Sequence, residues 1–147
     1  MATRELIVEG TPRSLQAKRT GLEQWKRHVV QAAQRTIPED EGSIQWDDVA
    51  VQILHFCPEW GDTSGDLDNI AKPILDALCD CGRVLFNDNQ VKEILLRRIE
   101  WRRLELLTIE GATACLADQL DRAVRGDGPP EFVYIFVTTH LALESLP

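Results

Sequence analysis

Three things are scarce in this sequence: long apolar runs, cysteine and net positive charge. The longest apolar stretches, such as residues 133–137, fall well short of the roughly 18 residues that a membrane span needs. The first ten residues also lack the layout of a signal peptide. We therefore expect a cytoplasmic protein that does not act at a membrane.

The chain has four cysteines, at positions 57, 79, 81 and 115. Without an export signal, reduced thiols are favoured over disulfides, because the cytosol keeps thiols reduced. A zinc site built from His55, Cys57, Cys79 and Cys81 is an alternative. The pairs His55/Cys57 and Cys79/Cys81 are each spaced more tightly than the usual pair of zinc ligands, however. We therefore expect the cysteines to be free thiols.

The formal net charge of −8 argues against attraction of a polyanion to the whole surface. The charges are unevenly distributed. Residues 1–36 hold seven Lys and Arg against three Asp and Glu, residues 37–90 hold two against twelve, and residues 91–103 hold five against two. A carboxylate block between basic arms fits a cation site with phosphate-binding flanks, and an acidic solvated surface is the alternative.

A length of 147 residues with 44% hydrophobic content predicts a single domain over residues 1–147. Alternating and helical spacings predict a mixed α+β fold, with helices packed on one mixed β-sheet. Strands are expected at 5–9, 44–56, 91–101 and 132–137, with 104–109 completing a hairpin with 91–101. Helices are expected from Thr20 to before Pro38, from Asp68 or Asn69 to Gly82, and over 112–125.

Carboxylates cluster where a loop enters the second expected helix. If residues 66–68 are extended, Asp66 and Asp68 project to the same side, because strand side chains alternate. A divalent cation would relieve their repulsion, and Mg²⁺ prefers such oxygen ligands. Asp88, in the next tight turn, supplies a third carboxylate. An EF-hand calcium loop is excluded, because Ile70 and Ala71 occupy positions that need an oxygen ligand and a glycine.

Lys72 lies one helical turn after Asp68, where its ammonium could reach a phosphate oxygen and stabilise developing negative charge. Asp76, one turn further, is expected to pair with Lys72. The alternative is that Asp68 caps the helix, Lys72 and Asp76 form a surface ion pair, and Asp66 and Asp88 are ordinary loop residues.

The combined pattern resembles the RusA family of Holliday junction resolvases. It reads Asp66-x-Asp68-Asn69-x-x-Lys72-x-Ile74-x-Asp76-Ala77-Leu78, followed by Phe86-Asn87-Asp88-Asn89-Gln90-Val91. Upstream, the resemblance extends to Phe56-Cys57-Pro58 and to Gly10-Thr11-Pro12, and it is strongest over residues 5–101. Residues 111–147 are expected to be a C-terminal helix and strand extension.

The resemblance implies a RusA-like fold and a homodimer that nicks four-way DNA junctions with Mg²⁺, or with Mn²⁺ in its place. Asp66, Asp68 and Asp88 match the family's essential aspartates, and Lys72 matches its active-site lysine. Asn69 and Asp76 belong to the motif as supporting residues. Asn87 stands where the family usually has another acid, and the acidic net charge departs from the family's generally basic character.

Further residues are candidates for contacts with the nucleic acid. The basic side chains are Lys18, Arg19, Lys26 and Arg27, with a second group at Arg97, Arg98, Arg102 and Arg103, of which only some can share one surface. The alternative is a solvated face. Trp25, Trp46, Trp60 and Trp101 are expected in the core or an interface, although Trp60 could contact a distorted base.

The sequence leaves three functions open: a metal-dependent endonuclease acting on branched DNA, a RusA-like nuclease redirected to another nucleic acid, and a non-catalytic interaction protein with the same fold. The acidic charge motivates the last two. The intact Asp66, Asp68, Lys72 and Asp88 favour catalysis.

Overall fold

A computed structural model describes residues 2–59, 66–103 and 112–141. Within them, no helix combines the length and apolarity that a transmembrane span requires. The strands are β1 (Thr3–Glu9), β2 (Val49–Cys57), β3 (Val91–Glu100) and β4 (Phe132–Thr138), and the α-helices are α1 (Arg19–Thr36), α2 (Leu67–Asp80) and α3 (Ala114–Arg125). Short 3-10 helices are η1 (Glu39–Glu41), η2 (Asp88–Gln90) and η3 (Trp101–Arg103).

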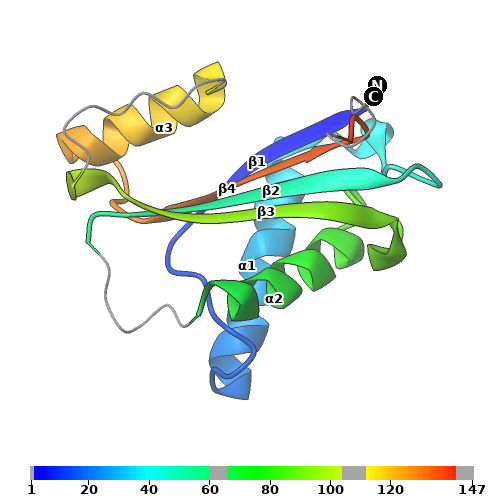
Figure 1. Cartoon of the computed structure of the whole chain (residues 1–147), viewed down its shortest axis with the longest axis horizontal. Helices are drawn as coiled ribbons and strands as arrows, with labels where there is room; N and C mark the ends of the chain where they lie inside the picture. The colour runs from blue at the N-terminus through cyan, green and yellow to red at the C-terminus, as the bar shows by residue number, and fades with distance from the viewer. Residues whose placement is uncertain (1, 60–65, 104–111, 142–147) are drawn as a thin grey trace, which may run out of the picture.

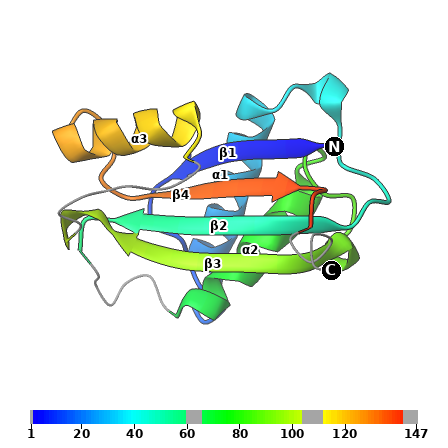
Figure 2. The same cartoon turned by 45° about the horizontal axis from the view of Figure 1, so that its top comes forward.

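The four described strands form one mixed sheet in the order β1-β4-β2-β3. β4 runs antiparallel to both of its neighbours, whereas β3 runs parallel to β2. The parallel pair is joined through α2, as a crossover connection requires. The expected α+β class with a mixed sheet is confirmed, and the strand of the C-terminal segment lies inside the sheet rather than beside it (Figure 2).

The helices cover the two faces of the sheet unequally. Figure 1 shows α1 and α2 below the sheet and α3 above one end of it. Because strand side chains alternate, Val51 and Ile53 pack toward α1 and α2, whereas Leu54 and Phe56 pack under α3. Phe56 stacks on Phe132 with ring centroids 4.8 Å apart. Part of the upper face is therefore left without a helix.

One strand is shorter in the structure than the sequence predicts. The strand expected at 44–56 begins only at Val49, and Ile44 makes a single parallel bridge to Leu85. Trp46 has a φ of 68°, which no β-strand accommodates. The expected hairpin partner of β3, residues 104–109, lies outside the described residues, and the partner that the structure shows for β3 is β2.

A polar network is buried beneath the end of β2. The His55 side chain has no exposed surface, and its Nδ1 accepts a hydrogen bond from Nε of Arg98 at 3.1 Å. The ring proton therefore lies on Nε2, which donates to Oε2 of Glu131 at 2.6 Å. The Thr11 hydroxyl donates to Oε1 of Glu131 at 2.5 Å. His55 thus links β2 and β3 to Glu131, the residue before β4, and Glu131 in turn holds Thr11 in the loop after β1.

Glu131 is expected to be the stabilising member of this network. Burial opposes its ionisation, but hydrogen bonds from His55 and Thr11 and the charge of Arg98 lower its pKa below the ordinary value. We expect Glu131→Ala to lower the free energy of unfolding by about 2–4 kcal/mol, because it leaves buried donors unpaired. Urea denaturation followed by tryptophan fluorescence measures this loss.

The loss should depend on pH with a defined sign. A lowered pKa contributes stability above the ordinary value of 4.5, and that stability disappears as the pH falls through the lowered value. The difference between wild type and Glu131→Ala should therefore shrink below about pH 4.5. Glu131→Gln keeps an acceptor oxygen and should lose less, and Glu23→Ala, at an exposed position of α1, is the control. Equal midpoints for Glu131→Ala and Glu23→Ala would contradict the assignment.

Candidate active site

The start of α2 presents two exposed carboxylates. Asp66 is the N-cap residue, but its side chain makes no capping hydrogen bond, and Asp68 lies in the first turn. The helix begins at Leu67, earlier than expected, so the condition that residues 66–68 are all extended is not met. Asp68 is not the cap either. Neither carboxylate is therefore engaged in capping the helix. Negative charge is favourable at the N-terminus of a helix.

A proline in α2 anchors the basic loop beside these carboxylates. Pro73 lies in the second turn of α2, and it has no N–H to donate to the carbonyl of Asn69. That carbonyl instead accepts a hydrogen bond from the backbone N–H of Leu15 at 3.0 Å. The loop that leads to Lys18 and Arg19 is therefore held against the first turn of α2.

Lys72 joins the two halves of the sequence motif. Its Nζ lies 2.9 Å from Oδ1 of Asp76, one helical turn away, and 3.2 Å from Oδ2 of Asp88. The pairing of Lys72 with Asp76 confirms the expectation. The hydrogen bonds to Asp76 and Asp88 raise the pKa of Lys72 above 10.5, so this ammonium stays charged at neutral pH. Lys72 and Asp88, which lie sixteen residues apart in the two parts of the motif, thus come together on one exposed surface.

Asp76 and Asp88 border a groove of about 340 Å³ between α1, α2 and the turn before β3. Lys26 of α1 lines it, with Nζ 3.7 Å from Oδ2 of Asp76. Cys79 also lines it, and burial followed by the charges of Asp88, Asp80 and Asp76 raises the pKa of Cys79 to about 11. This thiol stays protonated at neutral pH, and the groove has a negative field.

The turn that carries Asp88 is held by two amide side chains. The Asn87 side chain accepts a hydrogen bond from the backbone N–H of Asn89 at 2.8 Å. Oε1 of Gln90 accepts from the backbone N–H of Phe86 and of Asn87, both at 2.9 Å. Asn87 therefore serves the conformation of the turn. Gln90 belongs to the motif, but its role in holding the turn was not predicted, although its position three residues after Asn87 has the spacing of a capping box.

The structure does not gather the three predicted ligands, Asp66, Asp68 and Asp88, into one cluster. Among the described histidine, cysteine, aspartate and glutamate side chains, no three are gathered so as to hold a metal ion. The Asp88 carboxylate faces the ammonium of Lys72. The zinc alternative gains no support, because His55 is engaged by Glu131 and Arg98, and the four cysteines are free. A cation shared by Asp66, Asp68 and Asp88 stays a prediction.

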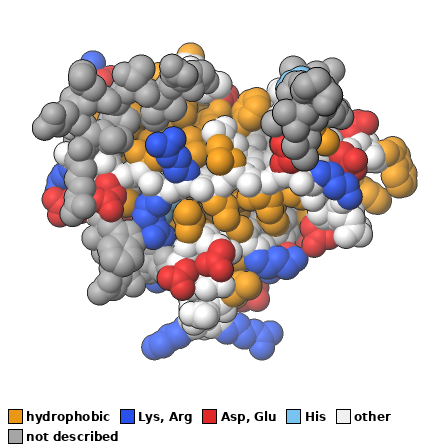
Figure 3. Space-filling view, viewed as in Figure 1, with side chains coloured by type: hydrophobic (Ala, Val, Ile, Leu, Met, Phe, Trp, Pro, Cys, Tyr) orange, Lys and Arg blue, Asp and Glu red, His pale blue; other side chains and the backbone are white. Residues whose placement is uncertain are grey.

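The basic side chains are spread over several surfaces. Lys18, Arg19 and Arg27 are exposed, and Figure 3 shows basic side chains at the lower tip of the molecule, where α1 begins. Arg98 is half-buried, and its Nε is held by His55. A phosphate-binding role for these residues and for Lys26 stays a prediction.

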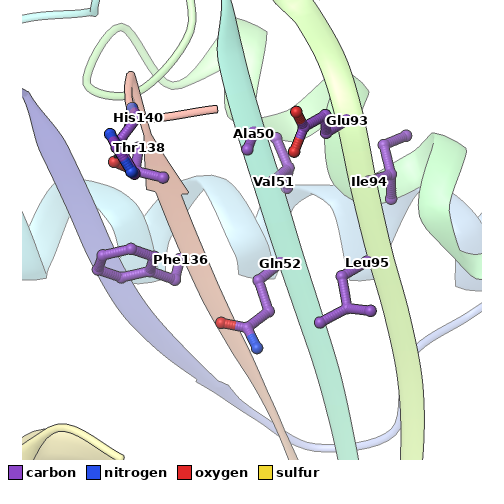
Figure 4. Close-up of a pocket in the computed structure, with 9 residues that line it drawn as sticks. All are labelled: Ala50, Val51, Gln52, Glu93, Ile94, Leu95, Phe136, Thr138 and His140. Atoms are coloured by element: carbon purple, nitrogen blue, oxygen red, sulfur yellow. Dashed lines mark hydrogen bonds between the residues drawn. The ribbon is translucent and has the colours of Figure 1, made fainter. Parts of the chain in front are cut away.

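A second and larger groove, of about 690 Å³, lies on the other face of the sheet. Gln52 of β2, Leu95 of β3 and Phe136 of β4 point into it, and the helices lie behind the strands in this view (Figure 4). It occupies the part of the upper face that α3 leaves open. The sheet therefore separates this groove from Lys72 and Asp88.

A comparison with protein families identifies the motif. The model of the family described as Endodeoxyribonuclease RusA matches residues 9–109. The chain belongs to the RusA family. The match includes α2 and the Asp88 turn, and it confirms the resemblance inferred from the sequence. The search of curated proteins finds no match. Although β4 lies beyond the RusA match, it supplies an inner strand of the sheet.

Proposed function

We propose that this RusA-family chain is a metal-dependent endodeoxyribonuclease that cleaves phosphodiester bonds in branched DNA. The observation that carries the proposal is the meeting of Asp88 with Lys72 and Asp76 on an exposed surface of α2. Three carboxylates line the groove beside them against one lysine, Lys26, and this excess of negative charge favours a cation. Asp66 and Asp68, at the start of the same helix, have carboxylates free of helix capping.

In this proposal Asp66, Asp68 and Asp88 hold Mg²⁺, or Mn²⁺ in its place. Their oxygen donors fit a hard cation. When bound, the ion would activate a water molecule and neutralise charge on the phosphate.

The other residues of the proposed site bind phosphate groups or hold the residues that do so. Lys72, kept protonated by its two carboxylate neighbours, donates hydrogen bonds to a phosphate oxygen in the transition state. Asp76 holds the Lys72 side chain from one helical turn away. Lys18 and Arg19, anchored beside α2 through Leu15, bind the phosphate backbone on the flank of the site. Lys26, Arg27 and Arg98 are assigned the same kind of role.

One assay separates the three functions that the sequence leaves open. The purified chain is incubated with labelled four-way junctions, continuous duplex, single-stranded DNA and RNA, with Mg²⁺, with Mn²⁺ or with EDTA. We expect cleavage of the junction with either metal and none with EDTA. Cleavage of RNA alone would indicate a redirected nuclease, and cleavage of no substrate would favour an interaction protein.

Homodimerisation and a cytoplasmic location complete the proposal. A four-way junction presents two equivalent strands, and a two-fold dimer places one active site at each. Light scattering on the eluate of a size-exclusion column measures the mass in solution. A mass of 16.6 kDa at assay concentrations would contradict the dimer, because it equals that of one chain.

A further inference from the structure

Two aromatic side chains stand exposed beside the proposed active site. Trp46 is 82% exposed and Phe86 is 56% exposed, and their ring centroids lie 5.6 Å apart at an angle of 44°. Trp25 and Trp101, by contrast, are buried as expected. Figure 3 shows hydrophobic side chains at the right-hand edge, over the turn that precedes β2. Exposure of two adjacent large aromatic side chains to water is unfavourable unless a ligand or partner covers them.

The backbone holds Trp46 in a conformation that a large side chain seldom adopts. Its φ of 68° is accompanied by a tight hydrogen bond across it, from the N–H of Asp47 to the carbonyl of Gln45 at 2.8 Å. Such a conformation costs roughly 1–3 kcal/mol, and it persists where the surrounding structure enforces it. The strain turns the indole outward rather than into the core.

One buried side chain locks both aromatic residues. Gln90 is 7% exposed, and its Nε2 donates to the carbonyls of Ile44 and Asp47 at 2.8 and 3.0 Å. Its Oε1 accepts from the backbone N–H of Phe86 at 2.9 Å. The loop of Trp46 and the turn of Phe86 are thus fixed to each other. The two rings form a rigid pair, which we call the aromatic shelf.

The aromatic shelf is continuous with the proposed active site. Phe86 lines the same groove as Asp88 and Lys26, and it lies two residues before Asp88. Asp47 and Asp48, directly after Trp46, are exposed. Carboxylates so close to the shelf repel phosphate groups, whereas the faces of the rings attract flat, uncharged groups. The unpaired base of a nucleic acid meets this description, because stacking on an aromatic ring requires no charge.

We propose that Trp46 and Phe86 stack against an unpaired or distorted nucleobase next to the phosphodiester bond that is cleaved. This inference rests on the proposed function and names the residues that would give it a preference for branched over continuous DNA. Bases at a branch point can leave their stack, whereas bases of a continuous duplex are occupied by their neighbours. The shelf would then select the substrate, and the carboxylates and Lys72 would act on it.

Binding of labelled DNA to the full chain tests the shelf without requiring cleavage. Fluorescence anisotropy in EDTA gives the affinity for a four-way junction and for a continuous duplex of the same sequence. We expect Trp46→Ala and Phe86→Ala each to weaken junction binding about five- to hundredfold, with a smaller effect on the duplex. Trp46→Phe keeps an aromatic ring and should restore most of the affinity. Val124→Ala, at an exposed position of α3, is the matched control.

A second measurement reports the contact directly. Stacking of a base on Trp46 should quench tryptophan fluorescence when the junction is added, and Trp46→Phe should abolish that part of the quenching. The same titration with an oligoarginine peptide examines a cationic protein partner, whose guanidinium groups could also stack on the rings. Quenching by the peptide but not by DNA would overturn the inference in favour of such a partner.

The outcomes distinguish this inference from the proposed function. Wild type that binds and cleaves junctions, with both alanine variants binding equally well, would overturn the shelf alone. Wild type that neither binds nor cleaves any DNA would overturn the shelf and the proposed function together. Unchanged melting temperatures of the variants would show that a loss of affinity is not a loss of fold.

Discussion

Replacing Asp68 by asparagine is expected to abolish DNA cleavage and to leave the fold intact. The two side chains have the same shape, so the variant removes one negative charge and little else. A ligand to a hard cation depends on that charge, and we expect the rate to fall on the order of a hundred- to a thousandfold. Single-turnover cleavage of a labelled four-way junction in Mg²⁺ measures the effect.

The position of Asp68 makes this test selective. The side chain is exposed in the first turn of α2, so its loss should cost only about 0.3–1 kcal/mol of favourable interaction with the helix terminus. Asp118→Asn, at an exposed position of α3 on the other face of the sheet, is the matched control. Full activity of Asp68→Asn would remove Asp68 from the site. Loss of activity in both variants would point to a general defect.

Local pattern was sufficient to predict most of the elements of this fold. The pattern of short apolar runs predicted β1 and β4 closely, because β1 buries Leu6 and Val8 beneath a helix, whereas the continuous apolar run of β4, an inner strand, is buried on both faces. It failed at residues 44–48, where Ile44 and Val49 suggested one continuous strand. There the buried amide of Gln90 holds the chain in a tight turn. That contact joins residues more than forty positions apart, and no local pattern shows it.

Strand order was beyond the reach of the sequence for a related reason. β4 inserts between β1 and β2 although it comes last in the chain. This order depends on which apolar faces are complementary after the helices have packed. The network of His55, Arg98 and Glu131 is likewise assembled from β2, β3 and the residue before β4. His55 and Glu131, seventy-six residues apart, have no spacing that could suggest their contact.

The candidate site was predictable in chemistry and less so in geometry. The motif correctly paired Lys72 with Asp76, because helical spacing sets that distance. It also placed Asp88 close to Lys72, although only family resemblance connected the two segments. The start of α2 was predicted less closely, because the N-cap is Asp66 rather than Asp68 or Asn69. One residue of difference at a helix start changes which side chains share a face.

Replacing Lys72 by methionine is expected to lower the cleavage rate about a hundredfold, through loss of an ammonium that stabilises charge in the transition state. Methionine keeps an unbranched chain of similar length. The ion pairs that Lys72 makes are about half exposed, so the melting temperature should change little. Single-turnover rates measure the effect, with Arg125→Gln, whose ion pair with Asp121 lies on α3, as the matched control.

The same variant should separate a role in phosphate binding from a role in holding the metal. Lys72 places a positive charge 3.2 Å from Asp88, and that charge opposes a cation at the same carboxylate. Lys72→Met should therefore reach half-maximal activity at a lower Mg²⁺ concentration than wild type, even though its maximal rate is lower. A higher Mg²⁺ requirement would contradict this, because it would mean that Lys72 helps to build the metal site.

The raised pKa of Lys72 adds a further check, which a pH profile of the wild-type rate measures. That rate should show no decline from deprotonation of Lys72 below pH 10.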